Sequence, residues 1–220
     1  MFSFLDLEFL GIIFPLLIKG ALITVELTVL AIVFGTLIGL MVALAKLSPI
    51  WPLRAFGNLY TWVLRGVPLL VQLYVLYYGL AQIGVLELNA FTAAVTGLSL
   101  CAGAYIAEII RAGIQSIDHG QKEAALSLGM SSANAMRRVI LPQAMRNILP
   151  PLGNEFITSL KDTSLVSVIT MIELMRTGVL LDVTYFRSME IYLSVAVIYL
   201  LLTTLFVYGI DYMERRFKII

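Results

Sequence analysis

The stretch ALITVELTVLAIVFGTLIGLMVALA, residues 21 to 45, decides the fold class of this chain. Its side chains are mostly apolar, and Glu26 is the one charged residue in it. A helix needs about 20 mainly apolar residues to cross the hydrocarbon core of a bilayer. The stretch therefore predicts a membrane-spanning helix, and we expect an all-α membrane protein.

The composition of the whole chain points the same way. Of the 220 residues, 60% are apolar and 13% are charged, and the mean hydropathy is +0.95. Soluble domains are nearer to about half apolar and about a quarter charged. The net charge of +1 gives no basic field that would attract a nucleic acid, so we expect no nucleic-acid partner. A single cysteine, Cys101, and a single histidine, His119, exclude an internal disulfide and a multi-histidine metal site.

Further apolar blocks predict four more crossings. Three of them are clear, at residues 59–83, 88–110 and 191–210. Another begins after Pro150 and Pro151 and runs to Leu174 with charged residues inside it, which is typical of a broken or two-part span. Residues 11–18 are too short to cross, so we expect them to lie at the membrane interface.

The basic residues indicate the orientation, because cytoplasmic loops carry an excess of Lys and Arg. They collect at alternate ends of the predicted spans, at Lys46, Arg54, Lys122, Arg137, Arg138, Arg146, Arg215, Arg216 and Lys218. Five crossings then place the N-terminus outside and the C-terminus in the cytoplasm. We expect residues 1–220 to form a single membrane domain surrounded by lipid.

The longest loop, residues 116–146, has helix signals of its own. Asp118 and Gln121 have the spacing of a capping box, and Gly129 is a typical helix stop. Ser131 or Ser132 can cap a second short helix, which we expect to end at Pro142. From local pattern this knob is either an amphipathic hairpin on the membrane or a docking element for a partner protein.

The same loop resembles the EAA loop of the membrane subunits of bacterial ABC importers. The residues that carry the likeness are Glu123-Ala124-Ala125, Gly129 and Val139-Ile140-Leu141-Pro142. In that family the loop docks into the ATPase subunit, so the resemblance implies a coupling role. The implied coupling residues are Gly120, Glu123, Ala124, Ala125, Leu126 and Gly129.

Three other stretches, together with the EAA loop, resemble the polar amino acid permeases of histidine, glutamine and arginine type: residues 65–73, 104–114, and 152–155 with 161–164. The resemblance implies a type I permease fold in the bacterial cytoplasmic (inner) membrane. It also implies two copies of a cytoplasmic ATPase subunit, a second identical or homologous permease, and an extracellular or periplasmic amino-acid-binding protein. No cofactor is expected on this chain, and the partner ATPase would use ATP and Mg²⁺.

Polar residues inside the predicted spans fall on helical stripes. Glu155, Thr158 and Asp162 share one face, and Cys101, Tyr105 and Glu108 share another. Arg65 and Gln72 repeat the seven-residue offset on the second span. Such stripes around a common axis would line a path for a polar solute. The predicted substrate-binding residues are Gln72, Cys101, Tyr105, Glu155, Thr158 and Asp162.

Some of these residues also have structural interpretations. Glu108 and Arg111 have the spacing of a helix-surface ion pair, and Arg65 is expected to pair with Glu26 or to support the turn at Gly66 and Pro68. We expect Glu155 to act in binding, because it follows a Pro-Pro-Leu-Gly-Asn sequence that predicts a helix break.

The charges on the stripe of Glu155, Thr158 and Asp162 bear on which amino acid is transported. Two carboxylates, Glu155 and Asp162, slightly favour arginine, lysine or histidine, while glutamine or cystine would also fit a hydrogen-bonding site.

The chain has no phosphate-binding loop of the Gly-x-x-x-x-Gly-Lys-Ser/Thr type and no catalytic triad, so we expect a non-catalytic subunit driven by a partner. Two alternatives remain open. An ion-coupled secondary carrier could relay ions through its intramembrane carboxylates, and a membrane scaffold could use the polar stripes to hold helices together.

Overall fold

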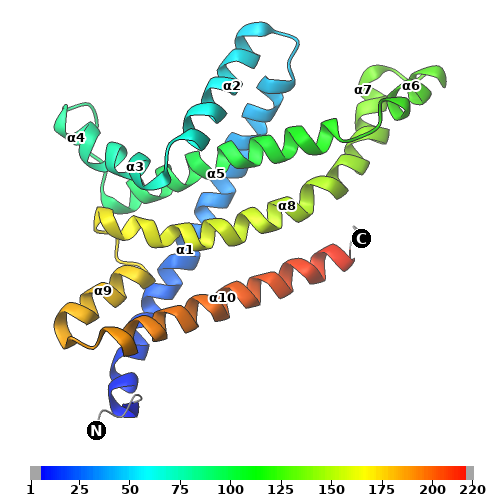
Figure 1. Ribbon diagram of the computed structural model, residues 1–220. Helices are drawn as coiled ribbons and strands as arrows, with labels where there is room; N and C mark the ends of the chain where they lie inside the picture. Colours follow the sequence, from blue (N-terminus) through cyan, green and yellow to red (C-terminus); the bar gives the residue numbers. More distant parts are fainter. Residues whose placement is uncertain (1–5, 217–220) are drawn as a thin grey trace.

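The computed structural model describes residues 6–216, and every regular element in that range is a helix (Figure 1). The elements are α1 (Leu7–Leu47), α2 (Trp51–Gly66), α3 (Leu69–Tyr74), the π-helix η1 (Val75–Gly79), α4 (Leu80–Gln82), α5 (Ala90–Gln115), α6 (His119–Ser127), α7 (Ser132–Ala135), the π-helix η2 (Met136–Ile140), α8 (Leu141–Asp162), the 3₁₀-helix η3 (Thr163–Ile169), α9 (Leu174–Tyr185) and α10 (Ser188–Arg216).

Three of these helices, α1, α5 and α10, are long and apolar enough to cross a membrane alone. Two bent segments reach the same criterion as pairs: α2 with α3–α4, bent by 102°, and α7–η3 with α9, bent by 47°. If each bent segment is one span, the described chain has the five crossings that the sequence predicts.

Helix α1 is longer than predicted, because residues 11–18 belong to it rather than to a separate interfacial segment. Its 41 residues extend over about 60 Å at a rise of about 1.5 Å per residue, which is about twice the thickness of the hydrocarbon core. Phe9, Ile13 and Leu17 lie on one side of this N-terminal part and pack against α9 and α10. This packing keeps the segment helical through Pro15.

The closest helix pair in the core is α1 with α5. A Cβ atom added to Gly39 would lie 2.8 Å from Ile106 Cγ2, and one added to Gly35 would lie 3.0 Å from Ala102 Cβ. Small residues four apart let two helix backbones approach closely inside a membrane. Helix α5 is thereby fixed against α1, and α8 packs on its other side.

The second predicted span is not one helix. Val67 is extended and Pro68 follows it, because a proline disfavours the helical conformation in the residue before it. The amide nitrogen of Gln72 closes the break by donating hydrogen bonds to the carbonyl oxygens of Leu64 and Val67, both at 2.8 Å. The predicted common stripe of Arg65 and Gln72 is therefore wrong, since the bend separates their helices.

The prediction of a break at Pro150 and Pro151 is also wrong. Helix α8 begins at Leu141 and runs through both prolines. The carbonyl groups that these prolines cannot bond belong to residues 146 and 147, and both residues are exposed, so solvent can satisfy them. Glu155 consequently lies within a continuous helix.

The break in this span comes later, between η3 and α9. Thr170 has a φ of +65°, and Glu173 caps α9 by accepting hydrogen bonds from the N–H groups of Met175 at 2.8 Å and Arg176 at 2.7 Å. Tyr199 of α10 donates its hydroxyl to the same carboxylate at 3.1 Å. The break is thus held by hydrogen bonds to the buried carboxylate of Glu173.

The long loop contains one separate helix instead of two. Asp118 caps α6 at the N–H of Gly120 (2.7 Å), and Gly129 ends it with a φ of +80°. Gln121 departs from the predicted capping box, because its side-chain oxygen accepts a hydrogen bond from Gln143 at 3.2 Å. Helix α7 starts at the Ser131 cap as expected, but it continues through η2 into α8, so Pro142 does not end it.

Helices α5 and α8 pack against each other, and other helices lie at the two ends of this pair. Figure 1 shows α6 and α7 at one end of this pair, and α3, α4 and α9 at the other.

Candidate functional site

The α8 stripe is formed as predicted. Helix α8 is continuous from Glu155 to Asp162, so Glu155, Thr158 and Asp162 share one face. Both carboxylate side chains are half-buried, while Thr158 is exposed and donates its hydroxyl to the carbonyl oxygen of Asn154 at 3.0 Å. A half-buried acidic face on a spanning helix is costly unless water or a ligand reaches it.

Neither carboxylate of this stripe has a cationic partner within residues 6–216. The ion pairs there join other residues, and no Lys or Arg nitrogen lies within 4.0 Å of Glu155 or Asp162. Lys161 is the neighbour of Asp162 in the chain but is exposed. The stripe therefore carries two carboxyl groups that are not ion-paired within the described residues, and an incoming cation could pair with them.

Cys101 borders this acidic region from α5. It is buried in the apolar cluster where α1, α3, α5 and η3 meet, and the carboxylates of Glu155 and Asp162 lie within electrostatic range of its thiol. The structure thus brings three of the predicted site residues together.

Tyr105 is one turn further along α5 and is partly exposed. The guanidinium of Arg65 lies over its ring, 5.2 Å from the centroid. Arg65 also lies 3.9 Å from Glu108, and in the described part of the chain it forms no ion pair with Glu26, contrary to the predicted alternative. Tyr105 and Arg65 together extend the polar wall toward the end that carries α6.

Glu108 differs from the α8 carboxylates because its charge is neutralised within the chain. It forms the predicted ion pair with Arg111 at 2.8 Å and a second, unpredicted one with Lys46 of α1. Lys46 also donates to the hydroxyl of Thr61 on α2 at 2.7 Å. The group joins three helices. Sequence reasoning missed Lys46 because its position after an apolar block is typical of a loop-flanking charge, and no local spacing links it to Glu108.

Gln72 is separated from the other predicted binding residues by its role in the second span. Its amide nitrogen has two hydrogens, and the carbonyls of Leu64 and Val67 accept both. In this conformation its side-chain oxygen is the part that remains for other partners.

The predicted coupling residues lie on α6 and at its ends. Ala125 is only 4% exposed and packs inside the loop, whereas Leu126 is 43% exposed and Leu128 is 84% exposed. Glu123 and Ala124 are also exposed. Gly120 and Gly129 lie at the two ends of the helix. The loop thus presents apolar and acidic side chains away from the helices that support it.

Helices long and apolar enough to span a membrane, a protruding helical loop and, in the described residues, carboxyl groups without an ion-pair partner along one helix are typical of a transport permease. Residues 35–219 match the family described as "Binding-protein-dependent transport system inner membrane component", and the chain belongs to this family.

Related proteins share nearly the whole chain. A probable amino-acid permease of Bacillus subtilis is 42% identical and covers 96% of this chain and 95% of its own length. The glutamine transport system permease of Escherichia coli is 42% identical, with 94% of each chain covered. The arginine transport system permease of Bacillus subtilis is 37% identical, with 93% of each covered.

A solved structure described as an amino acid ABC transporter with histidines has a TM-score of 0.92 and 47% identity, over 96% of this chain and 99% of that one. An inward-facing methionine ABC transporter shows the same fold, with a TM-score of 0.77 at 21% identity over 92% and 96%.

These comparisons identify the chain as the permease subunit of an amino acid ABC transporter, a non-catalytic component of the inner membrane. They give no support to an ion-coupled carrier. The relatives include both glutamine and arginine permeases, so the comparisons do not determine which amino acid this chain carries.

Proposed function

We propose that this chain and a second permease subunit, identical or homologous, form the translocation path of an ATP-driven importer. Two cytoplasmic ATPase subunits would bind and hydrolyse ATP with Mg²⁺, and a binding protein on the outer side would deliver the amino acid. The N-terminus then lies outside and the C-terminus inside. Family membership and the names of the relatives support this assembly.

The observation that carries the proposal is the exposed face of α6. Leu126 and Leu128, 43% and 84% exposed on this loop, together offer an apolar surface that a partner groove would cover. Ala125 is buried in the same loop, and α6 packs against α7 and η2, which lead into α8.

This connection gives a mechanical route from the ATPase to the acidic stripe. Helix α6 follows α5 and precedes α7, and Gln121 on α6 is hydrogen-bonded to Gln143 on α8. A partner that moved α6 would therefore move the α5–α8 pair, which carries Cys101, Tyr105, Glu155, Thr158 and Asp162. Rigid-body rocking of this kind alternates access to a midplane site.

The docking proposal is tested with Leu126→Asp in the reconstituted transporter. A buried charge in an apolar groove prevents binding, so we expect the ATPase to be lost on co-purification and ATP-driven uptake to fall at least tenfold. Leu7→Asp, at the exposed start of α1, is the matched control and should leave both unchanged. Ala125 is unsuitable for this test, because a charge there would disrupt the loop itself. Normal co-purification and uptake with Leu126→Asp would contradict the docking role.

For the cargo, we propose a preference for cationic amino acids, with Glu155 and Asp162 pairing with the ammonium or guanidinium group. Thr158, Cys101 and Tyr105 would line the same path. Gln72 would contribute its side-chain oxygen to this path and would also stabilise the break between α2 and α3. Within residues 6–216 no Lys or Arg nitrogen lies within 4.0 Å of Glu155 or Asp162, and this supports the preference over glutamine or cystine.

A further inference from the structure

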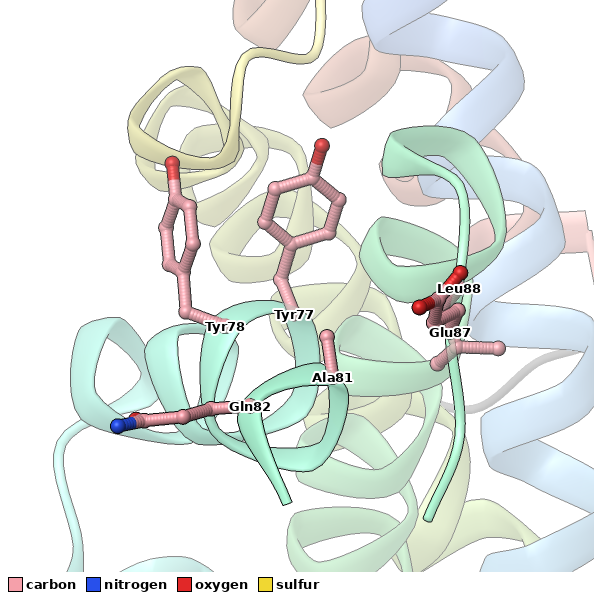
Figure 2. Close-up of a pocket in the computed structure, with 6 residues that line it drawn as sticks. All are labelled: Tyr77, Tyr78, Ala81, Gln82, Glu87 and Leu88. Atoms are coloured by element: carbon pink, nitrogen blue, oxygen red, sulfur yellow. The ribbon is translucent and has the colours of Figure 1, made fainter. Parts of the chain in front are cut away.

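A pocket lies between the second half of the broken second span and the connection that precedes α5 (Figure 2). It is open to the surface and has a volume of about 510 Å³. The lining residues are Tyr77, Tyr78, Ala81, Gln82, Glu87 and Leu88. In Figure 1 this region, near α4, is at the opposite end of α5 from α6.

The aromatic wall of the pocket is built by an irregular helix. The π-helix η1 (Val75–Gly79) carries Tyr77 and Tyr78, whose rings meet edge to face with centroids 4.7 Å apart. Tyr74 stacks on Tyr78 at 5.6 Å, and the Tyr78 hydroxyl donates to the carbonyl oxygen of Val168 at 3.2 Å. Single π-helical turns often occur at functional sites. Tyr78 is therefore held in place, and Tyr77 stands next to it in the pocket wall.

A carboxylate faces this wall from another segment. Glu87, in the connection before α5, is exposed and lines the same pocket, and it is the charged residue among those that do so. Figure 2 shows Tyr77 and Tyr78 rising from η1, with Glu87 beside Leu88 on the adjoining segment. Aromatic faces with a nearby carboxylate are the groups that bind an organic cation.

Aromatic residues also concentrate at membrane interfaces for reasons unrelated to ligands. That explanation accounts for tyrosines at this depth, but it does not require two rings and a carboxylate to line one pocket. It also predicts no response of the pocket to a soluble cation, so the two explanations differ in a measurable way.

We infer that this pocket binds the cationic side chain of an amino acid at the outer end of the permease, before the amino acid reaches Glu155 and Asp162. The inference rests on the proposed function, because the cargo preference and the outward orientation of this end come from it. The tyrosine faces would hold the ammonium or guanidinium group, and Glu87 would balance its charge.

The test places a thiol in the pocket with Ala81→Cys and follows its modification by a neutral maleimide in the nanodisc-embedded transporter. We expect saturating L-arginine to slow the modification at least threefold, because the bound side chain would cover the thiol, and L-glutamine to slow it by less than half as much. The native Cys101 is buried, and the parent protein measures any modification at that position.

Further substitutions test whether the protection by L-arginine arises in this pocket. Glu87→Gln or Tyr77→Leu, each added to Ala81→Cys, should remove most of the protection by L-arginine. Tyr77→Phe should retain it, because the ring is kept. Glu8→Gln, which changes an exposed carboxylate in the first turn of α1, is the matched control and should also retain it.

Several outcomes would overturn the inference: no protection, equal protection by L-arginine and L-glutamine, or protection that survives both Glu87→Gln and Tyr77→Leu. Loss of protection in Glu155→Gln would also overturn it, since the effect would then come from the midplane site. Failure of the proposed function looks different, because ATP-driven uptake of every amino acid would then be missing in the parent transporter.

Discussion

Glu108 on α5 and Glu155 on α8 are both acidic residues inside membrane helices, and their surroundings differ. Glu108 is held between Lys46 and Arg111, and its side chain is 17% exposed. Glu155, with Asp162 two turns away on the same face, has no Lys or Arg nitrogen within 4.0 Å in the described part of the chain. From this comparison we propose that Glu108 stabilises the fold and that Glu155 remains available for a ligand.

The largest expected effect is on stability, from Glu108→Gln. Removing this charge leaves Lys46, whose side chain is 7% exposed, without its carboxylate. Breaking one side of a buried pair costs about 3 to 5 kcal/mol, and we expect about 2 to 4 because Glu108 is partly accessible. Denaturant unfolding of the purified permease measures the change. Glu155→Gln, the matched control, should lower the free energy of unfolding by less than about 0.5 kcal/mol. Equal losses in the two variants would contradict the comparison.

A double substitution sharpens the assignment of Lys46 as the partner. Lys46→Met alone should destabilise the protein by about 2 to 3 kcal/mol, because it removes one of the two close cations from Glu108. Adding Glu108→Gln should cost much less than its effect in the parent protein, with a coupling energy of about 1 to 3 kcal/mol. The four proteins are compared by the same unfolding measurement. Additive losses would show that Lys46 and Glu108 act independently.

Arg65 should give the smallest change in stability. Its side chain is 44% exposed, it lies 3.9 Å from Glu108, and its guanidinium stacks on Tyr105 at 5.2 Å. Exposed contacts of these kinds are worth about 0.5 to 1 kcal/mol, so Arg65→Gln should cost no more than about 1 kcal/mol of unfolding free energy. A loss as large as that of Glu108→Gln would mean that Arg65 is a main partner of the cluster.

The same contrast separates what could be predicted from the sequence from what could not. Local spacing predicted the α8 stripe and the Glu108–Arg111 pair, because both depend on the period of one helix. It could not find Lys46, which meets Glu108 only because α1 and α5 cross at their glycines.

The proline positions show a similar limit. Val67-Pro68 ends a helix inside a predicted span, whereas Pro150 and Pro151 do not end one, because the exposed residues before them leave the freed carbonyls accessible. The pocket lined by Tyr77, Tyr78 and Glu87 was also missed. Its residues come from η1 and the connection before α5, and no regular period links them.

The central claim is that Glu155 is available to pair with a cationic amino acid. The most direct test is the ratio of ATP-driven L-arginine uptake to L-glutamine uptake in proteoliposomes, for the parent transporter and for Glu155→Gln. A charge-assisted hydrogen bond is worth about 1.5 to 3 kcal/mol, so we predict that the ratio falls at least tenfold while basal ATP hydrolysis is unchanged. An unchanged ratio would contradict the account.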